Sequence, residues 1–215
     1  MNERQTGQSP DIFSLRFLEA LQRLVDHHHV IYPTIPPKGR YFEALVEKAF
    51  KTVRQPFTWV KPTTPNAPRE DLIVGEIRIS LKTETGLGTN PKFILISKLL
   101  TTEKYPWTAE SLINRTLQHL SRYDYILMLR AVWEKPVIHY QLLDIPVDLL
   151  RLIEIAHLIP VGKLTERQSL GADVYHGDTK VFHVHFDGSD GKCQISRLAV
   201  EDCELLMVWD IQTED

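Results

Sequence analysis

Three polar residues near two short extended segments have side chains suited to the hydrolysis of a phosphodiester. Asp71 precedes the apolar run Leu72-Ile73-Val74, and Ser80 and Lys82 lie two residues apart in the segment that follows. A carboxylate holds a hard cation such as Mg²⁺ through oxygen. A lysine near the attacked phosphorus orients or deprotonates water, and the metal polarises the phosphoryl oxygen. These residue types together supply what such a hydrolysis needs.

A β-hairpin is the element that must bring the three residues together. Residues 76–84 alternate between polar and apolar types, which is the period of a strand, so Ser80 and Lys82 share one face. Gly75 precedes this segment and is suited to the turn. We therefore expect a hairpin in which Asp71 lies beside Ser80. An amphipathic hairpin with an ordinary solvated polar face is the alternative.

This arrangement resembles the PD-(D/E)xK nucleases, a superfamily that includes many type II restriction endonucleases. Asp71 matches the first aspartate of the motif, and Ser80-Leu81-Lys82 matches its tripeptide. The sequence departs from the motif twice, because no proline directly precedes Asp71 and because Ser80 replaces the usual acid. The resemblance covers roughly residues 38–157. It implies that Asp71 and the carbonyl of Leu81 bind Mg²⁺ and that Lys82 positions the attacking water.

The resemblance also implies that a carboxylate from elsewhere replaces the acid missing at position 80. Many restriction enzymes carry an active-site glutamate on an early helix, and Glu43 lies in the helical pattern of residues 40–53. Glu47 lies four residues later on the same side of that helix and is the second choice. Glu84 and Glu76 are further alternatives. For Glu43 and Glu47, a solvated helix face is the ordinary interpretation.

The remaining pattern predicts an α/β protein of the restriction-endonuclease-like class, with a mixed central β-sheet flanked by helices. Residues 93–100 are apolar and fit either a helix or a buried strand, and the part after residue 158 alternates like polar strands. We expect a single domain with an N-terminal helix and loop (1–37), a catalytic core (38–157) and C-terminal strands for DNA recognition (158–215). The expected helices cover 11–29, 40–53, 108–121 and 147–157, the strands 124–132 and 137–145, and the loops 33–39 and 61–68, after a frayed tail at 1–10.

Charge is distributed unevenly along the chain. The net charge is −3, but residues 38–104 contain 12 Lys or Arg and 7 Asp or Glu, whereas the remainder carries a net charge of −8. A duplex-binding cleft needs local positive charge, so double-stranded DNA is the expected partner. Side chains able to contact bases or phosphates are Arg40, Asn90, Lys92, Arg167, Gln168, Lys180, His183, His185, Lys192, Gln194 and Arg197.

Other features exclude several classes of protein. Cys193 and Cys203 form no CxxC motif, which argues against a thiolate zinc site and fits a reducing cytoplasm. The chain shows neither a signal peptide nor an apolar run long enough to span a membrane. His183 and His185 alternate on one strand face and could share a metal, but no third ligand with suitable spacing accompanies them, which favours DNA contact.

The resemblance and the charge pattern together predict a Mg²⁺-dependent type II restriction endonuclease of double-stranded DNA. Cleavage of both strands at a short palindromic site implies a C2 homodimer, since one active site cuts one strand. Two alternatives remain open. One is a repair or nicking nuclease of the same fold. The other is an inactive DNA-binding protein on this fold, which the serine at position 80 favours.

Overall fold

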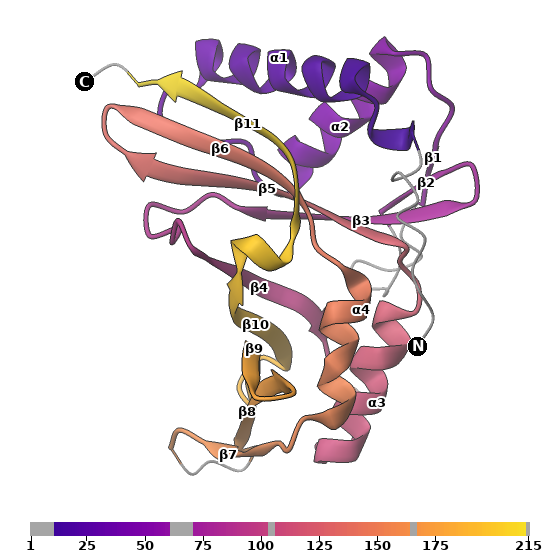
Figure 1. Cartoon of the computed structure of the whole chain (residues 1–215), viewed down its shortest axis with the longest axis vertical. Coiled ribbons are helices and arrows are strands. Elements are labelled where there is room, and N and C mark those ends of the chain that lie inside the picture. The colour runs from indigo at the N-terminus through magenta and orange to yellow at the C-terminus, as the bar shows by residue number, and fades with distance from the viewer. Residues whose placement is uncertain (1–10, 61–70, 103–105, 164–166, 214–215) are drawn as a thin grey trace.

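The computed structural model describes residues 11–60, 71–102, 106–163 and 167–213, and it contains two β-sheets with helices packed against them. Figure 1 shows α1 and α2 on one side of the first sheet, and α3, α4 and the second sheet on the other side. The helices are α1 (Leu15–Ile31), α2 (Arg40–Thr52), α3 (Ala109–Leu120) and α4 (Val147–Leu150), with short 3-10 helices at Asp11–Phe13, Arg151–Ile155 and Val200–Asp202.

The first sheet has six strands in the order β1-β2-β3-β5-β6-β11. Its strands are β1 (Thr58–Trp59), β2 (Leu72–Val74), β3 (Ile77–Glu84), β5 (Tyr125–Glu134), β6 (Val137–Asp144) and β11 (Glu204–Gln212). Strands β3 and β5 run parallel, with α3 in the connection between them, and the other pairs are antiparallel. The sheet is therefore mixed, and β3 lies inside it between β2 and β5.

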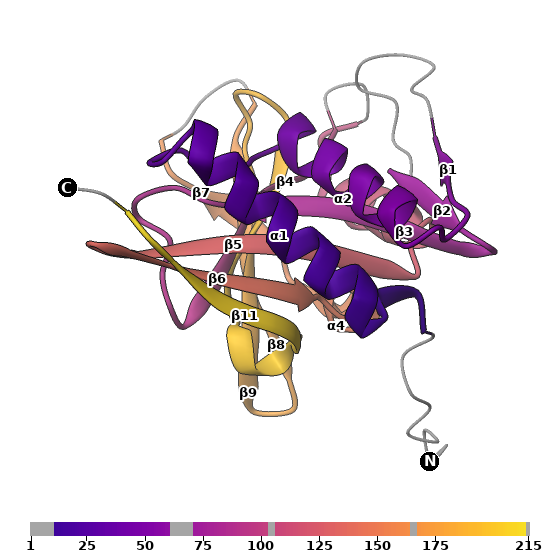
Figure 2. The ribbon, with the colours of Figure 1, turned by 90° about the horizontal axis from the view of Figure 1, so that it is seen from above.

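The second sheet is antiparallel and has five strands in the order β4-β10-β9-β8-β7. Its strands are β4 (Phe93–Thr101), β7 (Ile159–Val161), β8 (Ser169–His176), β9 (Thr179–Phe186) and β10 (Lys192–Ala199). Seen from above, β8 and β9 extend away from the first sheet, while α1 and α2 lie across it (Figure 2). The chain passes from β3 through residues 85–92 into β4, and β4 contacts β3, the strand that carries Lys82.

Two apolar cores occupy the two faces of the first sheet. Ile79 and Leu81 of β3 pack in the core beneath α1 and α2. Ser80 pairs with Ile126, and Lys82 pairs with Met128, which belong to the core on the opposite face. Because side chains alternate along a strand, Ser80 and Lys82 face the side of α3 and the second sheet. Ser80 is thus buried and Lys82 half-buried on the polar face of the hairpin. Glu76 and Arg78 near the turn stay exposed in part, so a solvated polar face describes only the turn end.

A buried arginine joins the two sheets. The Arg130 side chain on β5 has no exposed surface, and its Nε donates to Glu84 on β3 at 2.6 Å. Its Nη1 donates to the Gln141 side chain at 2.6 Å, and its Nη2 donates to the carbonyls of Asn90 and Phe93 at 2.5 and 2.9 Å. The last two partners lie where β4 begins. This one guanidinium therefore fixes the first sheet against the second.

Most elements expected from the sequence are confirmed. The hairpin forms, with Gly75 at φ 64° in its turn. The strands expected at 124–132 and 137–145 are present, as are the helices expected at 40–53 and 108–121. The α/β class is confirmed as well. Segment 93–100 is a strand that pairs with β10, and its residues Ile94, Ile96 and Leu99 are buried in the core. The tail 1–10 and the loop 61–68 lie outside the described residues.

Three expectations about the fold need correction. The helix expected over 147–157 is α-helical only at Val147–Leu150 and continues as a 3-10 helix to Ile155. The helix expected from Asp11 begins at Leu15, because Ser14 caps its first turn by accepting from the N–H of Phe17. The C-terminal strands do not extend one central sheet, since β7 to β10 form a second sheet and only β11 returns to the first. No helix in the described part of the chain is long and apolar enough to cross a membrane.

The Arg130 contacts predict a large loss of stability on Arg130→Met. The free energy of unfolding should fall by about 3–5 kcal/mol, because the change leaves the Glu84 carboxylate buried without its cation. Urea denaturation measures this quantity. The matched control is Arg23→Met, which removes an exposed ion pair with Glu19 and should cost under about 1 kcal/mol. Equal losses in the two variants would contradict the role given to Arg130.

Candidate active site

The carboxylate of Asp71, directly before β2, is hydrogen-bonded to the neighbouring strand β3. Asp71 directly precedes β2, and its N–H donates to the carbonyl of Ile79 at 2.9 Å. Its Oδ2 accepts from the N–H of Leu81 at 2.6 Å and from the hydroxyl of Ser80 at 3.2 Å. These bonds hold the carboxylate beside the Ser80-Leu81-Lys82 tripeptide, as the hairpin predicted.

Lys82 continues this hydrogen-bonded chain. Its Nζ donates to the Ser80 hydroxyl at 2.7 Å and to the Leu81 carbonyl at 3.3 Å. Burial lowers the pKa of Lys82 below its usual value of 10.5, the carboxylates of Asp71 and Glu43 raise it, and the cation of Lys98 lowers it further. The structure therefore connects the ammonium of Lys82 to the carboxylate of Asp71 through a single hydroxyl.

The structure separates the two candidate glutamates on α2. Glu43, in the first turn of the helix, is near enough to Lys82 to favour its charged form. The N–H of Gly39, immediately before α2, donates to the hydroxyl of Thr83 at 3.4 Å, so this end of the helix adjoins β3. Glu47 instead forms an exposed ion pair with Lys51 at 2.5 Å. Of the two glutamates, Glu43 is therefore the one whose charge acts on Lys82, although α2 packs on the opposite face of the sheet from the Lys82 side chain.

The two further alternatives are placed elsewhere. Glu84 shares the strand face of Lys82, but its carboxylate is bound by Arg130. Burial raises the pKa of Glu84, whereas the charge of Arg130 lowers it. Glu76 lies at the hairpin turn, in a surface hollow with Asp124 and Asp144, at the opposite end of β3 from Glu84. Glu84 is therefore engaged by Arg130, and Glu76 lies at the turn end of β3.

Two basic groups near Lys82 did not attract attention in the sequence. Lys98 on β4 lowers the pKa of Lys82. It lies at a register shift between β4 and β10, where four residues of advance along β4 correspond to two along β10. This irregularity leaves Ser97 and Lys98 both exposed. His119 on α3 is buried, and its ring bonds to the hydroxyl of Tyr123 at 2.8 Å. Its spacing is that of an ordinary helical residue, so no local signal singled it out.

Several expected DNA contacts have partners within the protein. Lys180 and His183 both bond to Oδ1 of Asp173 at 2.7 Å. The guanidinium of Arg167 lies 3.8 Å from the ring centre of Trp107.

Three further residues expected to contact DNA also have partners within the protein. The amide of Gln168 donates to the Val161 carbonyl at 2.6 Å. Lys192 forms an ion pair with Asp190, and the Asn90 side chain accepts the backbone N–H of Lys92 at 2.8 Å.

The remaining candidates are less constrained. Arg40 is exposed at the first position of α2, and the Lys92 residue is also exposed. His185 lines a shallow hollow together with Arg167, and Gln194 is half-buried in the middle of β10. The structure therefore does not gather all eleven expected DNA contacts on one site.

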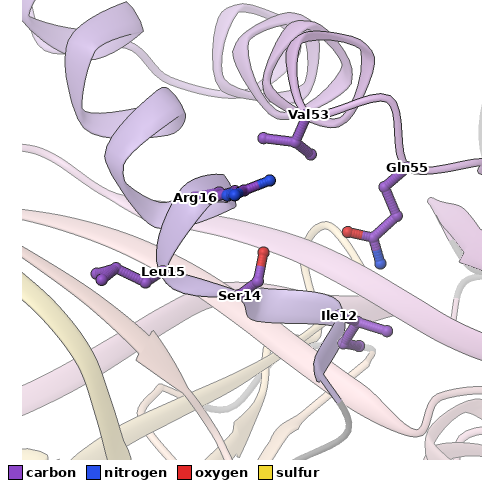
Figure 3. Close-up of a pocket in the computed structure, with 6 residues that line it drawn as sticks. All are labelled: Ile12, Ser14, Leu15, Arg16, Val53 and Gln55. Atoms are coloured by element: carbon purple, nitrogen blue, oxygen red, sulfur yellow. The ribbon is translucent and has the colours of Figure 1, made fainter.

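A separate hollow of about 830 Å³ lies where α1 begins. Figure 3 shows Arg16 reaching toward Val53 and Gln55, with Ser14 and Ile12 at the side. The described residues that line it include no carboxylate, in contrast to the surroundings of Lys82. Among the described residues, no group of three or more His, Cys, Asp or Glu side chains could hold a metal ion. The pair His183 and His185 accordingly gains no third ligand there.

The fold is consistent with the restriction-endonuclease-like α/β class. A family model for SmaI, described as a type II site-specific deoxyribonuclease, matches residues 5–211. The type II restriction enzyme SmaI of Serratia marcescens is 29% identical over 209 residues, covering 94% of this chain and 82% of that enzyme. No solved structure matches the chain. The chain therefore belongs to the SmaI family of type II site-specific deoxyribonucleases, which are hydrolases, and the expected relationship to type II restriction endonucleases is confirmed.

The environment of His119 predicts a stability change at mildly acidic pH. Burial, followed by the charge of Lys82, lowers the pKa of His119 from 6.5 to about 3. Between these two pKa values, His119 binds a proton in the unfolded chain but not in the folded protein. The contribution of neutral His119 to stability is therefore fully present above pH 6.5 and is lost as the pH falls below it. At pH 5 this loss amounts to about 2 kcal/mol.

The comparison with His119→Gln isolates this effect. Subtracting the unfolding free energy of the variant from that of the wild type at each pH cancels the contributions of other titrating groups. One such group is Asp144, whose pKa is raised by burial to about 7. From pH 7.5 to 5, the wild type should lose about 2 kcal/mol more than the variant. Parallel pH profiles for the two proteins would refute the buried, neutral state of His119.

Proposed function

We propose that this chain is a Mg²⁺-dependent endonuclease of the PD-(D/E)xK type that cleaves double-stranded DNA at a short palindromic site. The observation that carries the proposal is the hydrogen-bonded chain from Lys82 Nζ through the Ser80 hydroxyl to Oδ2 of Asp71. It joins a cation and a carboxylate across two paired strands. Family membership supports DNA as the substrate.

The oxygen atoms around Lys82 suit a hard cation. Asp71 and Glu43 would supply carboxylate oxygens, and Leu81 would supply its carbonyl, which also accepts from Lys82. Mg²⁺ is commonly held by one or two carboxylates while water and substrate phosphate complete its shell, so a two-carboxylate site fits. When bound, the ion would polarise a phosphoryl oxygen and lower the pKa of bound water.

The roles of the protein groups follow from their contacts. Lys82 would hold the attacking water and accept its proton at Nζ, a role that its lowered pKa assists. Ser80 occupies the position of the usual acid and orients both Lys82 and Asp71. Glu43 provides the carboxylate that position 80 lacks. The argument for an inactive protein, which depended on Ser80 alone, is weakened by this replacement.

The charge distribution supports a DNA cleft at this site. The basic block of residues 38–104 contains both Asp71 and Lys82, so phosphate contacts would fall beside the catalytic groups. Since one such site breaks one strand, cleavage of both strands would require a second copy. We propose a C2 homodimer, whose symmetry matches that of a palindromic site.

Glutamine substitutions on α2 test the assignment of the second carboxylate. Glu43→Gln should lower the single-turnover rate of plasmid cleavage in Mg²⁺ by roughly 100-fold or more, because a metal-binding oxygen loses its charge. Glu47→Gln is the matched control, one turn along the same helix in an exposed ion pair, and should cleave like the wild type. The reverse order of effects would exchange the two roles.

The core residues Asp71 and Lys82 allow a stronger test. Asp71→Asn and Lys82→Ala should each lower cleavage by roughly 1,000-fold with folding intact, as judged by circular dichroism. Full cleavage by either variant would exclude the proposed site. Discrete plasmid fragments from the wild type, lost on chelation by EDTA, would support a site-specific Mg²⁺ enzyme. Nicked circles alone would favour the nicking nuclease instead.

The pH dependence of cleavage tests the role of Lys82 as a proton acceptor. A neutral amine accepts a proton, so the rate should rise with pH and level off below 10.5, the usual pKa of lysine. Lys82→Arg keeps the positive charge but does not release its proton in this range. Its residual activity should therefore lack that plateau. An unchanged profile in Lys82→Arg would assign Lys82 an electrostatic role only.

A further inference from the structure

An unusual backbone conformation marks one residue of the second sheet. Among the described residues, the non-glycine positions with positive φ are Arg54 and Arg197, both at 58°. Side chains other than glycine rarely adopt this left-handed region, because the Cβ atom crowds the backbone. Such strain persists only where the surrounding structure imposes it, and it gathers at functional sites.

The conformation of Arg54 has a local explanation. Arg54 follows α2, and its N–H donates to the carbonyl of Lys51 at 3.2 Å. The N–H of Gln55 donates to the carbonyl of Phe50 at 3.0 Å. A left-handed residue commonly ends a helix in this way. No helix ends at Arg197, which lies within β10.

Arg197 occupies a β-bulge. Ile195 pairs with Ile96 and Leu198 pairs with Ile94, so three residue steps on β10 match two on β4. The additional residue makes Arg197 exposed, while its neighbours Ile195 and Leu198 remain buried. Bulges redirect a side chain away from the regular alternation of a strand, and they are common beside active sites.

The redirected side chain lines a cavity of about 650 Å³ next to the candidate active site. Glu84 lines the same cavity, and it lies two positions beyond Lys82 on one strand face, about 7 Å along the strand. Phe93 and Leu95 provide apolar walls that are 45% and 43% exposed. The cavity therefore begins two residues beyond Lys82 along β3 and presents uncovered apolar surface.

Arg197 differs from Glu84, Lys180 and Asn90, polar residues of this cavity whose side chains have partners within the protein. Glu84 is bound by Arg130, Lys180 is paired with Asp173, and the Asn90 side chain accepts backbone N–H groups. Within the residues that the structure describes, the guanidinium of Arg197 has no such partner. It is thus an exposed cation held by strained backbone beside the site, with its hydrogen-bond donors available to a ligand.

We propose that Arg197 is a specificity-determining residue that donates two hydrogen bonds to the O6 and N7 atoms of a guanine in the recognised duplex. The inference rests on the proposed function and specifies guanine as the base that Arg197 recognises. Arginine suits guanine because its planar donors match that pair of acceptors in the major groove. The bulge fixes the direction of the side chain, which favours base reading over a loose phosphate contact.

Arg197→Gly separates backbone strain from recognition. Glycine adopts φ 58° without strain, so the variant should unfold at a higher temperature than the wild type. It should nevertheless cleave the preferred site at least about 5-fold more slowly, the lower end expected for one lost arginine–guanine contact. Arg54→Gly is the matched control, which should gain similar stability and cleave at the wild-type rate.

The preferred site is obtained by sequencing the ends that the wild type produces from duplexes with a randomised segment. Arg197→Gly should lose its preference at one guanine of each half-site and retain it elsewhere. Replacing that guanine by 7-deazaguanine should slow the wild type but cause no further loss in Arg197→Gly. If Arg197→Gly fails to fold, Arg197→Asn replaces it, since asparagine tolerates the left-handed region.

The outcomes separate this inference from the proposed function. If the wild type produces no discrete ends in Mg²⁺, the proposed function fails. If it does, and Arg197→Gly cuts the same site at the same rate, only the role of Arg197 is overturned. A loss that is equal for every sequence would also overturn it, because that result indicates a phosphate contact.

Discussion

The fully buried guanidinium of Arg130 is the constraint on which the relation between the two sheets depends. A charge in an apolar interior is tolerated only when its donors are satisfied. Here the partners come from β3, β6 and the start of β4. Any shift of the second sheet against the first would break at least one of these bonds. Lys98 and Lys82, on β4 and β3, are held near each other as a result.

The candidate active site depends on backbone as well as on side chains. The shortest bond to Asp71 comes from the N–H of Leu81, so the carboxylate is fixed by the strand itself. Ser80 adds a second bond and passes the connection to Lys82. A serine at this position preserves the geometry of the tripeptide while removing a charge. The charge of Glu43, on the separate helix α2, favours the ammonium form of Lys82.

Irregularities of the β4–β10 pair place basic residues beside this site. One register shift exposes Lys98, and another gives Arg197 its left-handed backbone. A regular antiparallel pair would alternate these side chains strictly between two faces. A bulge or register shift lets a side chain point in a direction that regular alternation does not allow. The irregular pairing of β4 with β10 therefore gives Lys98 and Arg197 directions outside the regular alternation.

The sequence by itself determined the hairpin, the helices at 40–53 and 108–121, and the proximity of Asp71 to Ser80 and Lys82. These features depend on local periodicity, turn residues and pairing between adjacent segments, which a short stretch of chain encodes. It also gave the relationship to type II restriction endonucleases, because the motif lies within that hairpin.

Only the tertiary structure shows that Glu43 and Glu47 have different surroundings, because both project from the same side of α2 and differ only in what packs nearby. It also decided that strands β7 to β10 form a second sheet, that Arg130 is buried, and that Arg197 occupies a bulge. Each of these features depends on contacts between segments far apart in sequence. No local pattern records such contacts, since they form only when the two sheets pack together.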